Sequence, residues 1–151
     1  RKIPNLSATV VRFGSVFGYA TRMNQHTAVN TLVEHVSRGE AAQVWKGAVD
    51  QLRPYTHIDD CVAAINFIIE HDLFEGEVYN IVSENQTIRV ILEHIRTHMS
   101  RTTISMVDNE RANDFSFGMD DRKIRALGHT PRGTLSEGIA TLFAMQQKSH
   151  I

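Results

Sequence analysis

Short β-branched apolar runs alternate with stretches of helical periodicity along most of this chain. Residues 7–13 (SATVVRF) form a nearly all-apolar run, which is typical of a strand covered on both faces. Residues 27–39 then carry apolar side chains at helical spacing and end at a glycine. Further strands are expected at 43–45, 54–58, 77–82 and 103–107, a short helix at 121–128, and longer helices near 27–38, 60–71, 87–99 and 135–146. The alternation predicts an α/β architecture with some parallel strands.

Residues that can cap helices stand at the start of three expected helices. Thr87 opens one of them. Asp59 or Asp60 can cap another by accepting hydrogen bonds from amides of its first turn. Thr134 and Glu137 form a T-x-x-E capping box at the start of the last helix.

Composition excludes several classes of partner. The 151 residues include 42% hydrophobic and 22% charged side chains, which is typical of a globular protein. The formal net charge of -1 predicts neither a nucleic-acid partner nor an anionic membrane surface. No apolar run reaches the roughly 20 residues that a membrane helix needs. Cys61 is the one cysteine, so we expect no internal disulfide, no cysteine metal cluster and a reducing, cytoplasmic setting.

Glycine spacing argues against a complete dinucleotide-binding domain. Such domains usually open with a strand and a G-x-G-x-x-G turn whose amides face a pyrophosphate. The nine glycines here stand at 14, 18, 39, 47, 76, 118, 128, 133 and 138, and no such pattern can be drawn through them. We therefore expect the chain to be the later part of something larger.

Six motifs follow one another between about residues 7 and 143. They are RFGSVFG, the pair RM and VN, LRPYTHIDDCVAAI, VYN, LGHTP and LSEGI. In this order they resemble the extended short-chain dehydrogenase/reductase family, and more narrowly its NAD-dependent nucleotide-sugar epimerases and dehydratases. The resemblance implies that residues 1–151 are a C-terminal portion, with late strands of a Rossmann-like parallel sheet followed by a small α/β substrate-binding domain. It also implies that the Gly-rich cofactor-binding half is not among these residues.

The resemblance implies a cofactor contact after the first strand. Gly14 and the following Ser15 and Val16 would border bound NAD or NADP, and glycine would let the backbone turn sharply and approach a ligand closely. The family more often has asparagine where this chain has Ser15, and proline where it has Tyr19. Without the resemblance, the same residues read as an ordinary turn at the end of a strand.

The polar run 21–26 resembles a loop that faces the substrate. The resemblance implies that Arg22 and Met23 on this loop, and Asn30 on the helix after it, contact a nucleoside diphosphate sugar. Taken by itself, the run is a solvated loop.

A diphosphate needs cations, and arginine offers a planar fork of donors to its oxygens. The resemblance assigns Arg53 to the diphosphate, with Arg111 on a loop that folds back over the nucleotide. It also implies that the strand with Val44 and Trp45 runs past the nucleotide base, on which the Trp45 indole could stack. Without the resemblance, each of the two arginines is a surface residue or half of an ion pair, and Trp45 is a core residue.

His57, Asp59 and Asp60 include the residue types of acid–base catalysis, yet their spacing fits the end of a strand followed by a helix cap. The other histidines lack the spacing of a metal site. We assign neither catalytic residues nor a metal to this segment.

The family's chemistry depends on a Tyr-x-x-x-Lys pair, and none occurs here. Four residues after Tyr19, Tyr55 and Tyr79 stand Met23, Asp59 and Ser83. Two hypotheses follow: the C-terminal portion of an epimerase or dehydratase that works by transient hydride transfer, or a non-catalytic nucleotide- or protein-binding module that keeps the fold. In the first hypothesis, the parent protein binds a nucleoside diphosphate sugar. Members of the family commonly dimerise, so both a monomer and a homodimer are left open.

Overall fold

The computed structural model describes residues 6–22, 26–108 and 115–148. Its strands are β1 (Ala8–Phe13), β2 (Ser15–Phe17), β3 (Ala42–Trp45), β4 (Arg53–His57), β5 (Glu75–Ile81), β6 (Glu84–Gln86) and β7 (Ile104–Val107). Its helices are α1 (Ala28–Ser37), α2 (Ile58–Glu70), α3 (Ile88–His98), α4 (Arg122–Arg125) and α5 (Leu135–Lys148), with a 3-10 turn η1 (Lys46–Ala48). The predicted α/β fold is confirmed, and the expected strands and helices lie close to their predicted positions.

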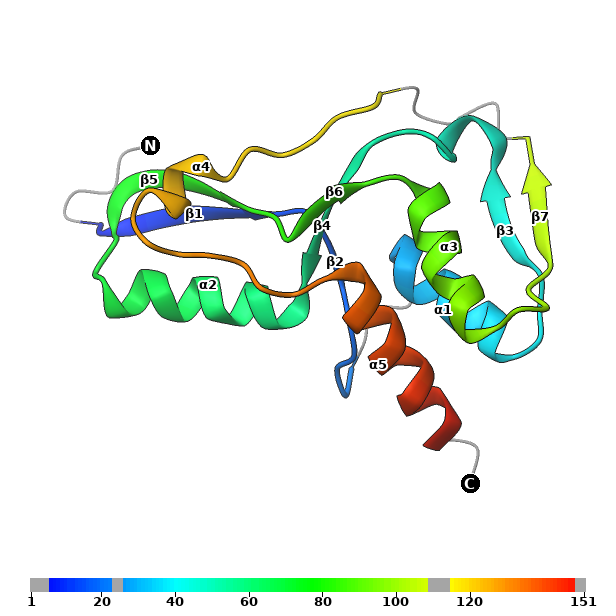
Figure 1. Ribbon diagram of the computed structural model, residues 1–151. Helices are drawn as coiled ribbons and strands as arrows, with labels where there is room; N and C mark the ends of the chain where they lie inside the picture. The colour runs from blue at the N-terminus through cyan, green and yellow to red at the C-terminus, as the bar shows by residue number, and fades with distance from the viewer. Residues whose placement is uncertain (1–5, 23–25, 109–114, 149–151) are drawn as a thin grey trace.

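Two lobes flank a small central sheet (Figure 1). In one lobe, β1 and β5 pair in parallel beside α2 and α4. In the other, β3 and β7 pair in parallel beside α1 and α3. Between them β4 pairs in parallel with β2 and antiparallel with β6. Among the described strands, β1 has β5 as its only partner, so its other edge is unpaired there.

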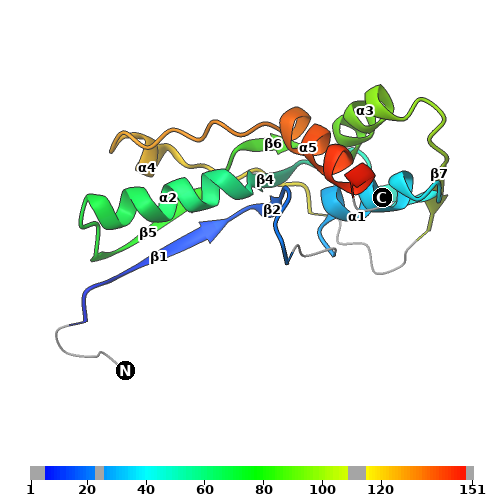
Figure 2. The same ribbon diagram turned by 90° about the horizontal axis from the view of Figure 1, so that it is seen from below.

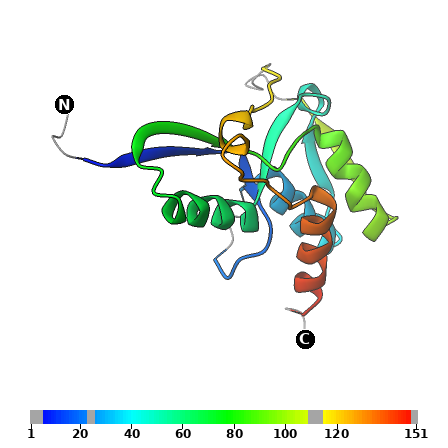
Figure 3. The ribbon, with the colours of Figure 1, turned by 60° about the vertical axis from the view of Figure 1, so that its left-hand side comes forward.

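Each lobe has its own hydrophobic core. Helix α5 packs against α1 and α3 (Figure 3), and this core includes Leu32, Val33, Ile91, Ile95, Ile139 and Leu142. Helix α2 covers β1 and β5 (Figure 2), and this second core joins Ala64, Ile68, Tyr79, Ile81 and Ile124. Because β2 and β4 lie between two packed lobes, side chains on these strands have a firm support.

Gly14 marks the point where the chain leaves one sheet for another. Its N–H donates to the Ile81 carbonyl oxygen of β5 at 3.2 Å and to Thr56 Oγ1 of β4 at 2.9 Å. A Cβ here would lie 2.7 Å from the backbone of Pro54, so the close approach that requires glycine is to β4. The sequence predicts only a turn at this point, whereas the chain continues directly as strand β2. Such short strands, β6 included, form because a neighbouring strand pairs with them.

The predicted caps of α3 and α5 are present. Thr87 Oγ1 accepts from the Val90 N–H at 3.5 Å. Thr134 Oγ1 accepts from the Glu137 N–H at 3.2 Å and donates to Glu137 Oε2 at 2.9 Å.

The predicted aspartate cap of α2 is wrong. The N-cap is His57, whose Nδ1 accepts from the Asp59 N–H at 3.2 Å. Asp59 and Asp60 lie within the first turn instead. The carboxylate of Asp60 binds amides from a distant part of the chain, described below, and local sequence gives no sign of such a contact.

We expect Gly138→Ala to lower the free energy of unfolding by about 1–3 kcal/mol, the usual cost of overpacking a core. A Cβ at this position would lie 2.5 Å from the ring of Phe17, which is 1% exposed. That clash outweighs the better helix propensity of alanine, which is worth about 1 kcal/mol. Gly47→Ala is the control, because a Cβ there meets nothing within 4 Å. Urea unfolding that gives both variants the same stability would contradict this prediction.

Candidate functional site

Arg53 of β4, Ser15 of β2 and Trp45 of β3 line one cavity of about 320 Å³, here called the Arg53 cavity. Its other lining residues are Ala28, Ala48, Gln51, Tyr55 and Ile88. A second cavity of about 260 Å³ shares Ala28, Trp45, Ala48 and Ile88 with it and adds Val44. The structure thus brings Ser15, Val44, Trp45 and Arg53 together, although they are dispersed in the sequence.

The guanidinium of Arg53 is held by its neighbours. Its Nη1 donates to the Leu52 carbonyl oxygen at 2.9 Å, and its Nη2 donates to Gln51 Oε1 at 2.5 Å. Its Cζ lies 5.2 Å from the centre of the Phe117 ring. Arg53 therefore lies beside Ser15 on a cavity, while its part in binding stays a prediction.

Strand alternation separates the two predicted base-contacting residues. Val44 is 5% exposed and packs in the core, whereas Trp45 is 48% exposed and faces the cavities. The alternative that Trp45 is a core residue is therefore wrong. Tyr55 is a buried wall of the Arg53 cavity, where burial raises the pKa of its phenol to about 12 against the lowering effect of the Arg53 cation. It is neutral at physiological pH.

Val16, Arg22 and Asn30 line a different cavity, of about 220 Å³. Asn30 is 3% exposed, and its Oδ1 accepts from the Gly18 N–H at 3.2 Å. Gly18 has a φ of 115°, which residues other than glycine rarely adopt. Asn30 therefore holds the turn after β2, and its contact with substrate stays a prediction.

Two further predicted substrate residues, Met23 and Arg111, lie outside the described residues. Three residues around the Arg53 cavity were missed by sequence reasoning: Gln51, Tyr55 and Phe117. Alternation along residues 53–57 could have placed Tyr55 on the same side as Arg53. Gln51 and Phe117 carry no such signal, because one lies in a loop and the other arrives from far along the chain.

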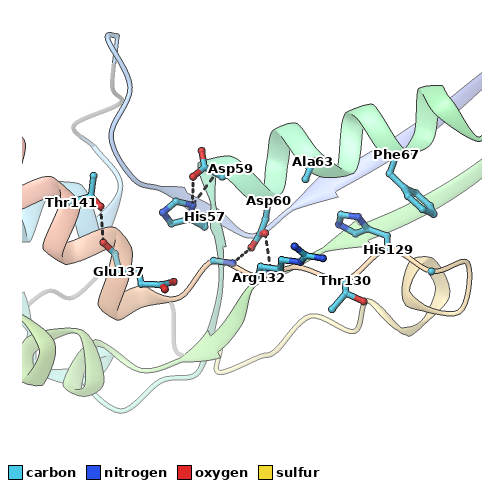
Figure 4. A pocket seen from close by; sticks show the side chains of 12 residues that line it. His57, Asp59, Asp60, Ala63, Phe67, His129, Thr130, Arg132, Glu137 and Thr141 are labelled. Atoms are coloured by element: carbon cyan, nitrogen blue, oxygen red, sulfur yellow. Dashed lines mark hydrogen bonds and ion pairs between the residues drawn. The ribbon is translucent and has the colours of Figure 1, made fainter.

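A larger cavity, of about 760 Å³, lies between α2, residues 128–133 and the start of α5 (Figure 4). Asp60 Oδ1 accepts from the Arg132 N–H at 2.8 Å, and Asp60 Oδ2 accepts from the Gly133 N–H at 3.0 Å and from Ser83 Oγ at 2.5 Å. Asp60 is 4% exposed, so this carboxylate joins three segments of the fold. The structure gives it a supporting part and adds no reason to assign it acid–base chemistry.

We expect the free energy of unfolding to fall as the pH drops below about 6.5, because of His129. It is 5% exposed, and its Nε2 has no hydrogen-bond partner among the described residues. Burial is the main cause that lowers the pKa of this imidazole below 6.5, with Asp60 as the strongest opposing influence. The unfolded chain therefore takes up the proton first as the pH falls.

The stabilising contribution of neutral His129 is complete above pH 6.5 and declines as the pH falls toward the lowered pKa of the folded state. Urea unfolding at a series of pH values measures the effect in wild type and in His129→Leu, which has no proton to bind. The variant should lose less stability on acidification. Equal losses in the two proteins would contradict the prediction.

Residues 1–82 match the model of the NAD dependent epimerase/dehydratase family. The chain belongs to this family. A curated relative, the low-salt glycan biosynthesis protein Agl12 of Haloferax volcanii, is 26% identical over 145 residues, which cover 92% of this chain and 44% of the relative. This epimerase/dehydratase-family chain thus spans less than half the length of Agl12.

Solved structures share the fold. UDP-glucuronic acid 4-epimerase from Bacillus cereus matches with a TM-score of 0.83 and 20% identity, over 95% of this chain and 46% of the epimerase. DesIV, a dTDP-glucose 4,6-dehydratase from Streptomyces venezuelae, matches with a TM-score of 0.81 and 18% identity, over 96% and 45%. The fold of this epimerase/dehydratase-family chain is therefore found in about half of each larger enzyme.

The parts of the chain that the structure describes give little support for a membrane segment, a metal site or a reactive cysteine. There, no helix combines the length and apolar character that crossing a membrane requires. Within the same residues, no group of three or more His, Cys, Asp or Glu side chains is placed to hold a metal ion. Cys61 is a buried free thiol, and burial is the main cause that raises its pKa to about 11. A thiol with so high a pKa is a poor nucleophile.

Proposed function

We propose that this chain is the C-terminal, substrate-binding portion of an NAD(P)-dependent epimerase or dehydratase acting on a nucleoside diphosphate sugar in the cytoplasm. The observation that carries the proposal is the Arg53 cavity. Three different strands bring a cation, an exposed indole and a hydroxyl to it, namely Arg53, Trp45 and Ser15. A nucleoside diphosphate sugar presents groups that match the first two, an anionic diphosphate and a flat base, and the hydroxyl is left for the cofactor.

The physical roles follow from the residue types. The Arg53 guanidinium offers parallel N–H donors to diphosphate oxygens, and such charge-assisted bonds are stronger than neutral ones. The half-exposed Trp45 ring offers an apolar face to a base at little conformational cost. Arg22 and Asn30, on the cavity beside Val16, are proposed to contact the sugar.

The proposed cofactor contact is at Gly14, Ser15 and Val16. Ser15 lines the Arg53 cavity and Val16 the cavity of Arg22, so β2 carries one residue toward each proposed subsite. This fits one wall of a cofactor site, next to the sugar. NAD supplies hydride transfer when bound, and the chain's own residues bind and orient the substrate beside it. The Bacillus cereus epimerase and DesIV are both complexes with NAD.

The test uses the natural, full-length protein, incubated with NAD and a panel of UDP- and dTDP-sugars. We expect epimerisation or dehydration of one sugar class, and no turnover by the 151-residue chain alone, because it has no Tyr-x-x-x-Lys pair. Turnover by the purified 151-residue chain would refute the proposal that this chain binds the substrate while catalysis needs the rest of the protein. Saturable binding without turnover by the natural protein would support the non-catalytic binding module instead.

A further inference from the structure

Residues 115–121 run past the central sheet without regular secondary structure (Figure 1). They are tied to Leu52, the residue before β4, by two hydrogen bonds. The Leu52 N–H donates to Ser116 Oγ at 2.9 Å, and the Phe117 N–H donates to the Leu52 carbonyl oxygen at 3.0 Å. The backbone of Phe117 therefore has a fixed position beside the start of β4.

A second tie lies two residues further on, at β6. The side-chain amide of Asn85 donates to the Met119 carbonyl oxygen at 3.0 Å and accepts from the Met119 N–H at 2.8 Å. A Cβ on Gly118 would lie 3.2 Å from that amide, so the segment lies tight against β6. The backbone of Phe117 is therefore held on both sides along the chain, while its side chain is 50% exposed.

This segment places the Phe117 ring under the Arg53 guanidinium, with 5.2 Å between Cζ and the ring centre. A cation over an aromatic face is attracted by the ring's negative π-surface. Gln51 Oε1 accepts from Nη2 at 2.5 Å, and the N–H donors of a guanidinium lie in the plane of the group. The ring thus restricts the tilt of the group, and the amide restricts its rotation.

We propose that Phe117 and Gln51 are positioning residues that hold Arg53 ready for a diphosphate. The inference rests on the proposed function, in which Arg53 binds that group. Neither residue needs to touch the ligand: Phe117 does not line the Arg53 cavity, and Gln51 lines it with its oxygen turned to Arg53. A long side chain loses rotamer entropy when a ligand fixes it, and fixing it beforehand lowers that cost.

The test is a titration of the natural, full-length protein with UDP and dTDP, and with uridine and thymidine for comparison. Phe117→Leu should weaken diphosphate binding by about three- to tenfold, the range expected for a cation–π contact that becomes partly desolvated. Nucleoside binding should not change. Phe117→Tyr keeps the ring face and should stay close to wild type. Phe115→Leu is the matched control, because Phe115 is a phenylalanine of the same segment and is 71% exposed.

Gln51→Ala is the independent second variant, with an expected loss of about two- to fivefold in diphosphate binding. In an Arg53→Ala background, neither Phe117→Leu nor Gln51→Ala should weaken binding further, because the cation that they position is gone. Thermal melts accompany each titration to show that the variants are folded.

The outcomes separate this inference from the proposed function. If Arg53→Ala leaves diphosphate binding unchanged, the proposed function is wrong at this cavity and the positioning role is wrong with it. If Arg53→Ala weakens binding while Phe117→Leu behaves like Phe115→Leu, the proposed function stands and the positioning role alone is overturned. Equal losses for diphosphate and nucleoside would make Phe117 a base contact and would also overturn it.

Discussion

Arg53→Ala should weaken the binding of a nucleoside diphosphate sugar by about ten- to a hundredfold. A hydrogen bond to a charged group contributes about 1.5–3 kcal/mol, and about 1.4 kcal/mol corresponds to a factor of ten. Arg53→Lys should restore only part of the loss, since an ammonium lacks the planar fork of donors. Isothermal titration of the natural protein with UDP- and dTDP-sugars measures both variants.

Arg122→Ala is the matched control, because this arginine is exposed in the other lobe and pairs with Asp120 at 2.6 Å. Exposed ion pairs contribute little to stability, and Arg122 belongs to α4, which lies in the lobe of β1 and β5 (Figure 1) and not in the elements that line the Arg53 cavity. A thermal melt of each variant completes the experiment. Unchanged affinity with a lowered melting temperature would make Arg53 a structural residue and would remove the main support for the proposed substrate.

Local pattern was sufficient for the elements that bury an apolar face. The helical periodicity of residues 87–99 and the β-branched run of residues 7–13 both predict elements that the structure contains. β2 and β6 were missed because each spans three residues, too few for a period to show. What forms them is pairing with β4, and that pairing depends on contacts distant in sequence.

The candidate site was foreseeable only through the family resemblance. Spacing alone would not bring Ser15, Trp45 and Arg53 to one cavity, because three strands from two sheets must first be arranged around it. One part that the resemblance did not supply is made by an irregular segment, residues 115–121. Phe117 reaches Arg53 through hydrogen bonds to Leu52, and no periodicity in the sequence points to that contact.

The wrong cap of α2 has the same kind of cause. An aspartate at the start of a helix usually accepts from amides of its own first turn. Asp60 instead accepts from the amides of Arg132 and Gly133, far along the chain, while His57 caps the helix. A tertiary contact thus gives Asp60 a different role from the helix cap that local sequence rules predict.

Asp60→Ala should lower the free energy of unfolding by about 2–4 kcal/mol. The carboxylate accepts from two backbone N–H groups and from the Ser83 hydroxyl in a site where Asp60 is 4% exposed. Removing it leaves buried donors without acceptors, which costs about 1–3 kcal/mol for each group that water cannot reach. Urea unfolding measures the loss.

Asp60→Asn should cost less than Asp60→Ala, because its one oxygen can still accept from an amide while its NH₂ group faces a second donor. Asp59→Ala is the matched control, since this neighbouring carboxylate in the same helical turn is 87% exposed. Its removal should change the free energy of unfolding by at most about 1 kcal/mol, the scale of an exposed charge at a helix start. If Asp59→Ala and Asp60→Ala destabilise equally, the effect belongs to the charge of the first turn. The bonds to residues 132 and 133 would then not be what joins α5 to α2.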